Sequence, residues 1–227
     1  MPLASILGAY MLVSYMILPG LLHHRYKHLA FSSNVSKTTI TEQGTPGDPI
    51  NVGLIGTSTE VAHVLFMAGW YPAARKNVLS IAHEIESIMM HRPYKDAPVS
   101  NLYFLERKQD MAFEQPVNNS PRRRHHVRFW RFGNFDISGR TVWLGAATFD
   151  TSVGFSHLTG QITHHINPDI DAERDKLIGD IRKTGLLGNV YQIDGVGPKV
   201  NGRNGGGDRY FTDGKIKIAN IALGHLD

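Results

Sequence analysis

Two pairs of adjacent histidines have the residue types and spacing to do chemistry. His125 and His126 lie in the run Ser-Pro-Arg-Arg-Arg-His-His-Val-Arg-Phe-Trp-Arg at residues 120–131, and His164 and His165 lie farther along the chain. Imidazoles exchange protons near neutral pH, and guanidinium groups match the geometry of phosphate oxygens. We therefore expect a site for an anionic, phosphorylated ligand, with hydrolysis as a candidate reaction.

The first histidine pair lies in a segment whose composition is typical of a β-strand. In an extended chain, successive side chains point to opposite faces, so this segment has one cationic face and one mainly apolar face. The cationic face carries Arg124, His126, Arg128 and Trp130, and the other face carries His125, Val127 and Phe129.

Imidazoles from both pairs are expected to reach one ligand from adjacent strands, with His126 and His165 as the leading pair. The arginines of the first run would bind the negative charge of the ligand. The candidate catalytic residues are His125, His126, His164 and His165, and the candidate ligand-binding residues are Arg122, Arg123, Arg124 and Arg128.

A bound metal is a further candidate for the same site. The chain contains no cysteine, which excludes disulfides, thiolate zinc sites and cysteine nucleophiles. A divalent metal would therefore be the candidate cofactor, held by histidine and acidic side chains. The candidate ligands are His126, His165, Asp150 and Asp169.

The same residues also fit a role without chemistry. One histidine of each pair would pack inside, its neighbour would form hydrogen bonds at the surface, and the arginines would pair with Asp171, Glu173 and Asp175. For His157 and His225, this structural role is the favoured interpretation.

A binding or accessory module is the second functional class that the basic run supports. Such a module would recognise the headgroups of anionic lipids, or the acidic surface of a membrane-protein partner, through residues 122–124. An enzyme should lose activity when His126 or His165 is replaced. A binding module should instead lose affinity when the arginines are neutralised.

The length and charge of the chain limit the number of domains and the kind of partner. The chain has 227 residues, with 24 Lys and Arg against 20 Asp and Glu, and a formal net charge of +4. This length suits one well-packed domain. The modest charge favours a small anionic ligand over a polyanion, and nucleic acid is therefore not an expected partner.

The N-terminal segment predicts a connection to a membrane. Residues 3–22 carry no charge and are long enough to cross a hydrocarbon core as a helix, so residues 1–28 are interpreted as a single transmembrane anchor with a basic flank. A cleaved signal peptide is disfavoured because no Lys or Arg precedes the apolar run. Positive charge after the span favours a cytoplasmic location for the remainder of the chain.

The rest of the chain divides into a linker and one domain. Residues 29–49 are mostly small and polar and predict a linker, and residues 50–227 predict the folded domain. Helical and strand patterns follow one another without regular alternation. The expected fold is therefore α+β, with packed helices and a mixed or antiparallel sheet.

Helix and turn signals mark several elements inside this domain. Thr57 and Glu60 predict a capping box for a helix that ends near Ala68, and Asn167 is expected to cap a helix that ends near Thr184. A third helix is predicted for residues 77–92, a mobile loop for residues 195–207, and a β-hairpin around Asp213-Gly214.

Several stretches together resemble the LssY C-terminal domain family. The resemblance covers most of residues 50–223, and it implies a bacterial protein linked to a type I secretion locus and set at a membrane, without implying a particular reaction. The stretches are Asn51-Val-Gly-Leu-Ile-Gly, Ala68-Gly-Trp, Ala97-Pro-Val-Ser, Gln109-Asp-Met-Ala-Phe, residues 120–130, Val142-Trp-Leu-Gly-Ala-Ala-Thr-Phe-Asp, Thr163-His-His-Ile, Asp171-Ala-Glu-Arg-Asp and Asp208-Arg-Tyr-Phe-Thr-Asp-Gly.

Overall fold

A computed structural model describes residues 2–26, 37–73, 101–117, 120–134 and 140–222, and these residues form an α+β fold, as expected. The main sheet has eight strands in the order β11-β14-β3-β9-β8-β7-β4, with β10 paired to the end of β9. Strands β14 and β3 run parallel, and the other neighbours run antiparallel. Their bounds are β3 Val52–Gly56, β4 Tyr71–Pro72, β7 Met111–Val117, β8 Ser120–Asn134, β9 Thr141–Phe155, β10 Ile162–Ile166, β11 Leu187–Asp194 and β14 Lys215–Ile221.

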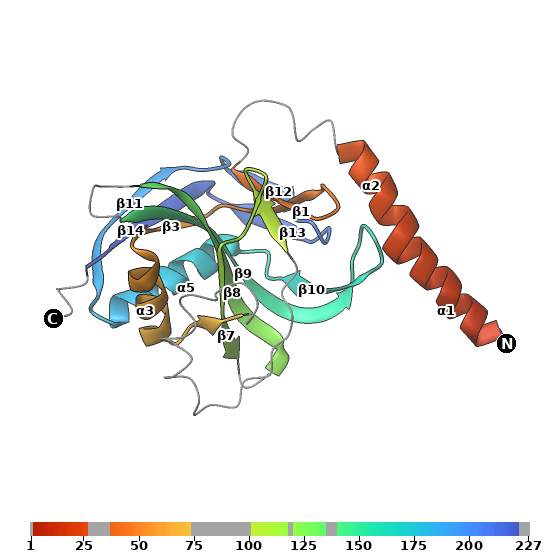
Figure 1. The fold of residues 1–227 in the computed structure, drawn as a ribbon, viewed down its shortest axis with the longest axis horizontal. Helices are drawn as coiled ribbons and strands as arrows, with labels where there is room; N and C mark the ends of the chain where they lie inside the picture. Colours follow the sequence, from red (N-terminus) through yellow and green to blue (C-terminus); the bar gives the residue numbers. More distant parts are fainter. Residues whose placement is uncertain (1, 27–36, 74–100, 118–119, 135–139, 223–227) are drawn as a thin grey trace.

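Two helices cover one face of this sheet (Figure 1). They are α3, Ser58–Met67, and α5, Ile170–Lys183. Their apolar stripes pack on the inward side chains of the strands, which removes a continuous apolar surface from water. This core includes Val61, Leu65, Leu177, Ile181, Phe113, Val127 and Phe129.

A small four-stranded sheet covers part of the opposite face. Its order is β2-β1-β5-β6, and a second apolar core that includes Phe104, Trp130 and Leu144 lies between the two sheets. The molecule is therefore layered as helices, main sheet and small sheet. The four strands are β1 Thr38–Thr41, β2 Pro46–Pro49, β5 Leu102–Phe104 and β6 Arg107–Lys108.

The linker prediction is wrong for residues 38–49, because residues 38–41 form β1 and residues 46–49 form β2. Their polar groups are satisfied inside the structure: Oγ1 of Thr39 donates a hydrogen bond of 2.8 Å to the backbone carbonyl of Asp48. Composition alone misses this segment because its polar side chains find partners within the fold and do not need to face water.

The helix ends agree with their sequence signals, with one exception. The capping box of Thr57 and Glu60 is present, and both helices are followed by a glycine with positive φ, +81° at Gly69 and +75° at Gly185. The N-cap of α5, however, is Asp169 rather than Asn167, because its side chain accepts a hydrogen bond of 3.0 Å from the backbone of Ala172. The helix expected at residues 77–92 lies outside the described residues.

The expected hairpin at Asp213-Gly214 is wrong. Strand β13, Arg209–Thr212, pairs with β12, Lys199–Arg203, whereas β14 pairs with β11 and β3. The carboxylate of Asp171 binds Oγ1 of Thr212 at 2.7 Å and the backbone N–H of Asp213 at 2.6 Å, so α5 holds the turn between the two sheets. Residues 195–207, expected as a mobile loop, therefore contain the β12 half of a two-stranded sheet.

The N-terminal segment is helical and stands beside the domain (Figure 1). It consists of α1, Pro2–Leu12, a π-helical turn, Val13–Ile17, and α2, Leu18–Tyr26. The part from Ala4 to Leu22 is long and apolar enough to cross a membrane, and most of it is exposed. The helix contacts the β9–β10 loop, since the hydroxyl of Tyr10 donates a hydrogen bond of 2.9 Å to the carbonyl of Gly160. The cytoplasmic location of the chain after this helix stays a prediction.

The packing between the layers predicts opposite effects for two glycine replacements. In Gly145→Ala, the new methyl group would lie 2.7 Å from the ring of Phe129 and 2.9 Å from Val52, and we expect a loss of about 1–3 kcal/mol in the free energy of unfolding. The control is Gly179→Ala in α5, where the methyl group meets no atom within 4 Å, and we expect a gain of about 0.5–1 kcal/mol. Urea unfolding of the full chain measures both, and an unchanged midpoint for the first variant would contradict this packing.

Candidate functional site

A polar cavity of about 360 Å³ lies between the main sheet and the segments that cover it. Residues 41–48 and 204–206 contribute to its rim. Its floor comes from β8, β9 and β10, and β8 presents the cationic face that strand alternation predicts. The charged and imidazole side chains of the floor are Arg124, His126, Arg128, Asp150 and His164.

Arg124 is the central cation of the floor and is almost fully buried, with 4% of its surface exposed. Its Nη1 donates to Oε2 of Glu114 at 2.8 Å, and its Nε donates to Oδ2 of Asp150 at 3.0 Å. These partners stand on the strands to either side of β8. The charge of Arg124 is therefore satisfied by the protein itself.

His126 lies between a hydroxyl group and a carboxylate. Its Nε2 is 2.8 Å from Oγ1 of Thr148, and its Nδ1 is 3.2 Å from Oδ1 of Asp150. An imidazole held in this way can exchange a proton with the hydroxyl while the carboxylate stabilises the charged ring. The arrangement is compatible with proton transfer.

Asp150 stays ionised in this buried setting. Burial opposes ionisation and by itself raises the pKa of the carboxyl. The neighbouring charges of His126, His164 and Arg124 outweigh burial, so the pKa of Asp150 lies well below its ordinary value of 3.8. The floor thus alternates cationic and anionic groups at short range.

Arg128 is the cation of the floor whose charge the protein balances least closely. Its Nη1 is 3.7 Å from Oδ2 of Asp48, and its Nε and Nη1 are buried without a hydrogen bond to any residue that the structure describes. Burial lowers the pKa of this guanidinium. Buried donors without partners are costly, and they indicate a place where a ligand or a water molecule completes the hydrogen bonding.

The second histidine pair is divided between two faces of β10. His164 lines the cavity, whereas His165 points to the other face, where its Nδ1 is 2.7 Å from Oδ1 of Asp208. Strand β10 pairs with β9 on the edge away from β8, and this register sets which histidine faces the floor. The expected approach of His126 and His165 to one ligand is therefore not what the structure shows: His126 shares the cavity with His164.

The remaining candidates of the basic run lie outside the cavity. His125 points toward the helices, with its Nδ1 2.7 Å from Oε2 of Glu173 and its ring stacked on Phe149 at 4.5 Å between centroids. Arg123 is exposed and lies over the same phenylalanine ring at 5.7 Å. The side chain of Arg122 lies outside the described residues.

The four expected metal ligands do not form one group. Asp150 contacts His126, but His165 faces Asp208 and Asp169 caps α5.

The pairing expected for a purely structural role also differs from the observed one. Arg124 pairs with Glu114 and Asp150, and the acids of α5 have other partners: Asp171 and Asp175 pair with Arg174, and Glu173 pairs with His125.

The comparison with protein families shows which family the chain belongs to. Its sequence matches the family described as LssY C-terminus over residues 32–216, which is most of the chain. The chain belongs to this family. No curated protein and no solved structure matches this LssY C-terminal chain. The match begins before residue 38, in agreement with the finding that β1 and β2 belong to the fold.

Three residues of the site in this LssY C-terminal domain escaped the sequence analysis. Glu114 lies on β7 and Thr148 on β9, and each stands directly opposite His126, so pairing of their segments with the basic run would have found them. Asp48 carried no signal, since it stands in the polar stretch that predicted a linker.

The buried charge network predicts a strong effect for Asp150→Asn. The variant leaves Arg124 with Glu114 as its remaining buried carboxylate partner among the described residues, and it removes the carboxylate beside His126. We therefore expect the free energy of unfolding to fall by about 3–5 kcal/mol at pH 7. Because the pKa of Asp150 is lowered by folding, its contribution is fully present above pH 3.8 and is lost as the pH falls toward the lower folded pKa. The difference between the variant and the parent chain should therefore shrink below about pH 4.

Urea unfolding at several pH values measures this difference. Asp194→Asn is the matched control, because Asp194 pairs with Lys215 on the exposed surface and its removal should change stability little. Equal losses in the free energy of unfolding for Asp150→Asn and Asp194→Asn would contradict the buried charge network.

Proposed function

We propose that this LssY C-terminal domain binds an anionic, phosphorylated ligand in the cavity, close to a membrane that holds the N-terminal helix. The observation that carries the proposal is Arg128, which lines the polar cavity and whose buried Nε and Nη1 have no hydrogen-bond partner among the described residues. Phosphate oxygens would accept charge-assisted hydrogen bonds from these nitrogens, which lie on different edges of the guanidinium group. Such binding would offset the cost of burying this guanidinium.

The difference in pairing between the two arginines of the floor supports an anionic ligand at Arg128. Arg124 is neutralised by Glu114 and Asp150, whereas the nearest carboxylate that the structure describes at Arg128 is that of Asp48, at 3.7 Å, with Asp150 acting from farther away. The imidazoles of His126 and His164 also line the cavity and can offer N–H donors to a ligand. A cavity of about 360 Å³ has room for a phosphate group and part of the molecule that carries it.

Arg128→Gln tests the binding of phosphate. The amide cannot form the two charged hydrogen bonds of the guanidinium, so we expect the affinity for inorganic phosphate to fall by about 100-fold or more. Isothermal titration of the purified full chain in detergent measures the affinity, and the unfolding temperature checks that the variant is folded. Arg123→Gln is the control, because Arg123 is exposed outside the cavity.

The outcome also separates the two functional classes. If Arg123→Gln lowers binding to vesicles that contain phosphatidic acid while Arg128→Gln changes nothing, the domain is a surface-binding accessory module and the cavity proposal fails. If Arg128→Gln lowers binding to the vesicles as well as to free phosphate, the ligand is a phosphorylated headgroup.

Hydrolysis of the bound phosphoester is a second candidate function, and the position of His126 between Thr148 and Asp150 favours it. In hydrolases this order lets the imidazole take the hydroxyl proton as the hydroxyl oxygen bonds to phosphorus. The bond from phosphorus to the ester oxygen breaks, the leaving alcohol takes up that proton, and water then hydrolyses the phosphothreonine to release phosphate. The chemistry would then need His126 and Thr148, and the ligand would be held by Arg128.

Release of p-nitrophenol from p-nitrophenyl phosphate tests this function. We expect His126→Gln and Thr148→Ala to lower the rate by about 10²–10⁴-fold while phosphate binding persists. His63→Gln, on α3, is the control and should keep the rate. An inactive parent chain that still binds phosphate through Arg128 would leave the domain as a binding module and reject hydrolysis.

A further inference from the structure

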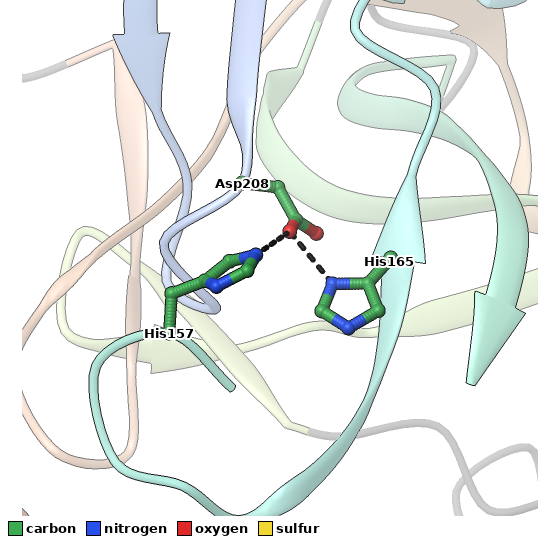
Figure 2. Close-up of side chains that lie close together, drawn as sticks. All are labelled: His157, His165 and Asp208. Atoms are coloured by element: carbon green, nitrogen blue, oxygen red, sulfur yellow. Dashed lines mark hydrogen bonds and ion pairs between the residues drawn. The ribbon is translucent and has the colours of Figure 1, made fainter. Parts of the chain in front are cut away.

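We propose that His157, His165 and Asp208 form a divalent metal site, with Zn²⁺ as the ion that fits best (Figure 2). The three residues come from separate segments: the β9–β10 loop, strand β10 and the turn before β13. The site lies on the face of β10 opposite the cavity, and it does not rest on the proposed ligand.

The three side chains converge with the spacing of metal ligands. Oδ1 of Asp208 is 2.7 Å from Nδ1 of His165 and 3.5 Å from Nε2 of His157, and the ligand atoms of all three lie within 4.8 Å of one another. Ligand atoms around a tetrahedral Zn²⁺ are roughly 3.3 Å apart when each metal–ligand bond is about 2.0–2.1 Å. Small shifts of the two imidazoles would therefore complete the geometry.

The carboxylate of Asp208 is held in place by the backbone around it. Its Oδ2 accepts a hydrogen bond of 3.0 Å from the N–H of Ile166, and its own N–H donates to Oδ1 of Asn204 at 2.9 Å. This leaves Oδ1 directed at the two imidazoles, as Figure 2 shows. Outer hydrogen bonds of this kind orient ligands at metal sites.

Two glycines leave the room that both imidazoles need. A Cβ at Gly154 would lie 2.6 Å from Nε2 of His165, and a Cβ at Gly207 would lie 2.8 Å from Cβ of His157. Gly207 also has a φ of +86°, which disfavours any other residue. The chain therefore permits a close approach of these rings that larger residues would prevent.

The site is also accessible and has the donor set of an open zinc centre. The side chain of His157 is 61% exposed, so an ion can enter from solvent, whereas that of Asp208 is only 7% exposed. Two imidazoles and one carboxylate with a remaining open position are a recurrent ligand set for Zn²⁺. The absence of cysteine in the chain makes this donor set the expected kind.

A metal at this site would fix one wall of the cavity. His157 lies between Ser156 and Thr159 in the loop that lines the cavity, and Asp208 follows Gly206, which lines it from the other side. A bond from each to one ion would hold these two segments together. The metal would then hold this wall of the cavity in position without contacting the cavity floor.

Zinc binding to the full chain tests the proposal. The purified chain is stripped with EDTA, and Zn²⁺ alone is titrated by calorimetry, with bound zinc measured by elemental analysis. We expect one Zn²⁺ per chain at this site and a higher unfolding temperature. His157→Ala and Asp208→Asn should each lower the affinity by at least about tenfold. Because His157 is exposed, its replacement should leave the fold intact.

A variant of the N-terminal histidines is the control. His23, His24 and His28 stand close together in the sequence and are another source of imidazole ligands. The variant His23→Gln, His24→Gln and His28→Gln should therefore keep the site and its effect on the unfolding temperature. The proposal is overturned if the parent chain takes up no zinc, or if His157→Ala binds zinc as the parent chain does. Loss of all zinc binding in the triple variant would overturn it as well.

Discussion

The guanidinium of Arg124 joins three strands of the main sheet through two buried carboxylates. Glu114 on β7 and Asp150 on β9 each accept a hydrogen bond from it, so the strands are locked in register at the cavity floor. A buried charge of this kind is stable only while its partners remain, and loss of one partner leaves an uncompensated ion. Because the carboxylates are used in this way, Arg128 is the cation whose hydrogen bonds the described part of the protein does not complete.

The two faces of strand β8 meet different parts of the molecule. Toward the helices, Val127 and Phe129 fill the main core, and His125 joins the sheet to α5 through Glu173. Toward the small sheet, His126 and the arginines meet the cavity. A substitution on the first face should act mainly on folding, whereas one on the second face can also act on a ligand, and neighbouring positions of one strand therefore carry different constraints.

Some local signals in the sequence predicted local structure correctly, whereas the hairpin signal at Asp213-Gly214 failed because β14 pairs with β11 and β3. The alternation of β8 and the capping box of Thr57 depend on residues close together in the chain, and both are confirmed. Features that depend on distant partners were missed. The polar Asp48 belongs to the fold because it meets residues of other strands, and the choice between the two histidines of β10 depends on which edge of β9 that strand joins. His165 and Asp208 are 43 positions apart, and sequence spacing gave no reason to group them.

The contact between Tyr10 and Gly160 links the N-terminal helix to the cavity. The loop that contains Gly160 also supplies Ser156 and Thr159 to the cavity wall, and the ring of Phe155 packs edge-on against Tyr10. Tyr10 lies within the stretch Ala4–Leu22, so a bilayer crossed by this stretch would compete with the loop for the same side of the helix. Crossing of a bilayer by this stretch and packing of Tyr10 against the cavity wall are therefore alternative arrangements of the helix.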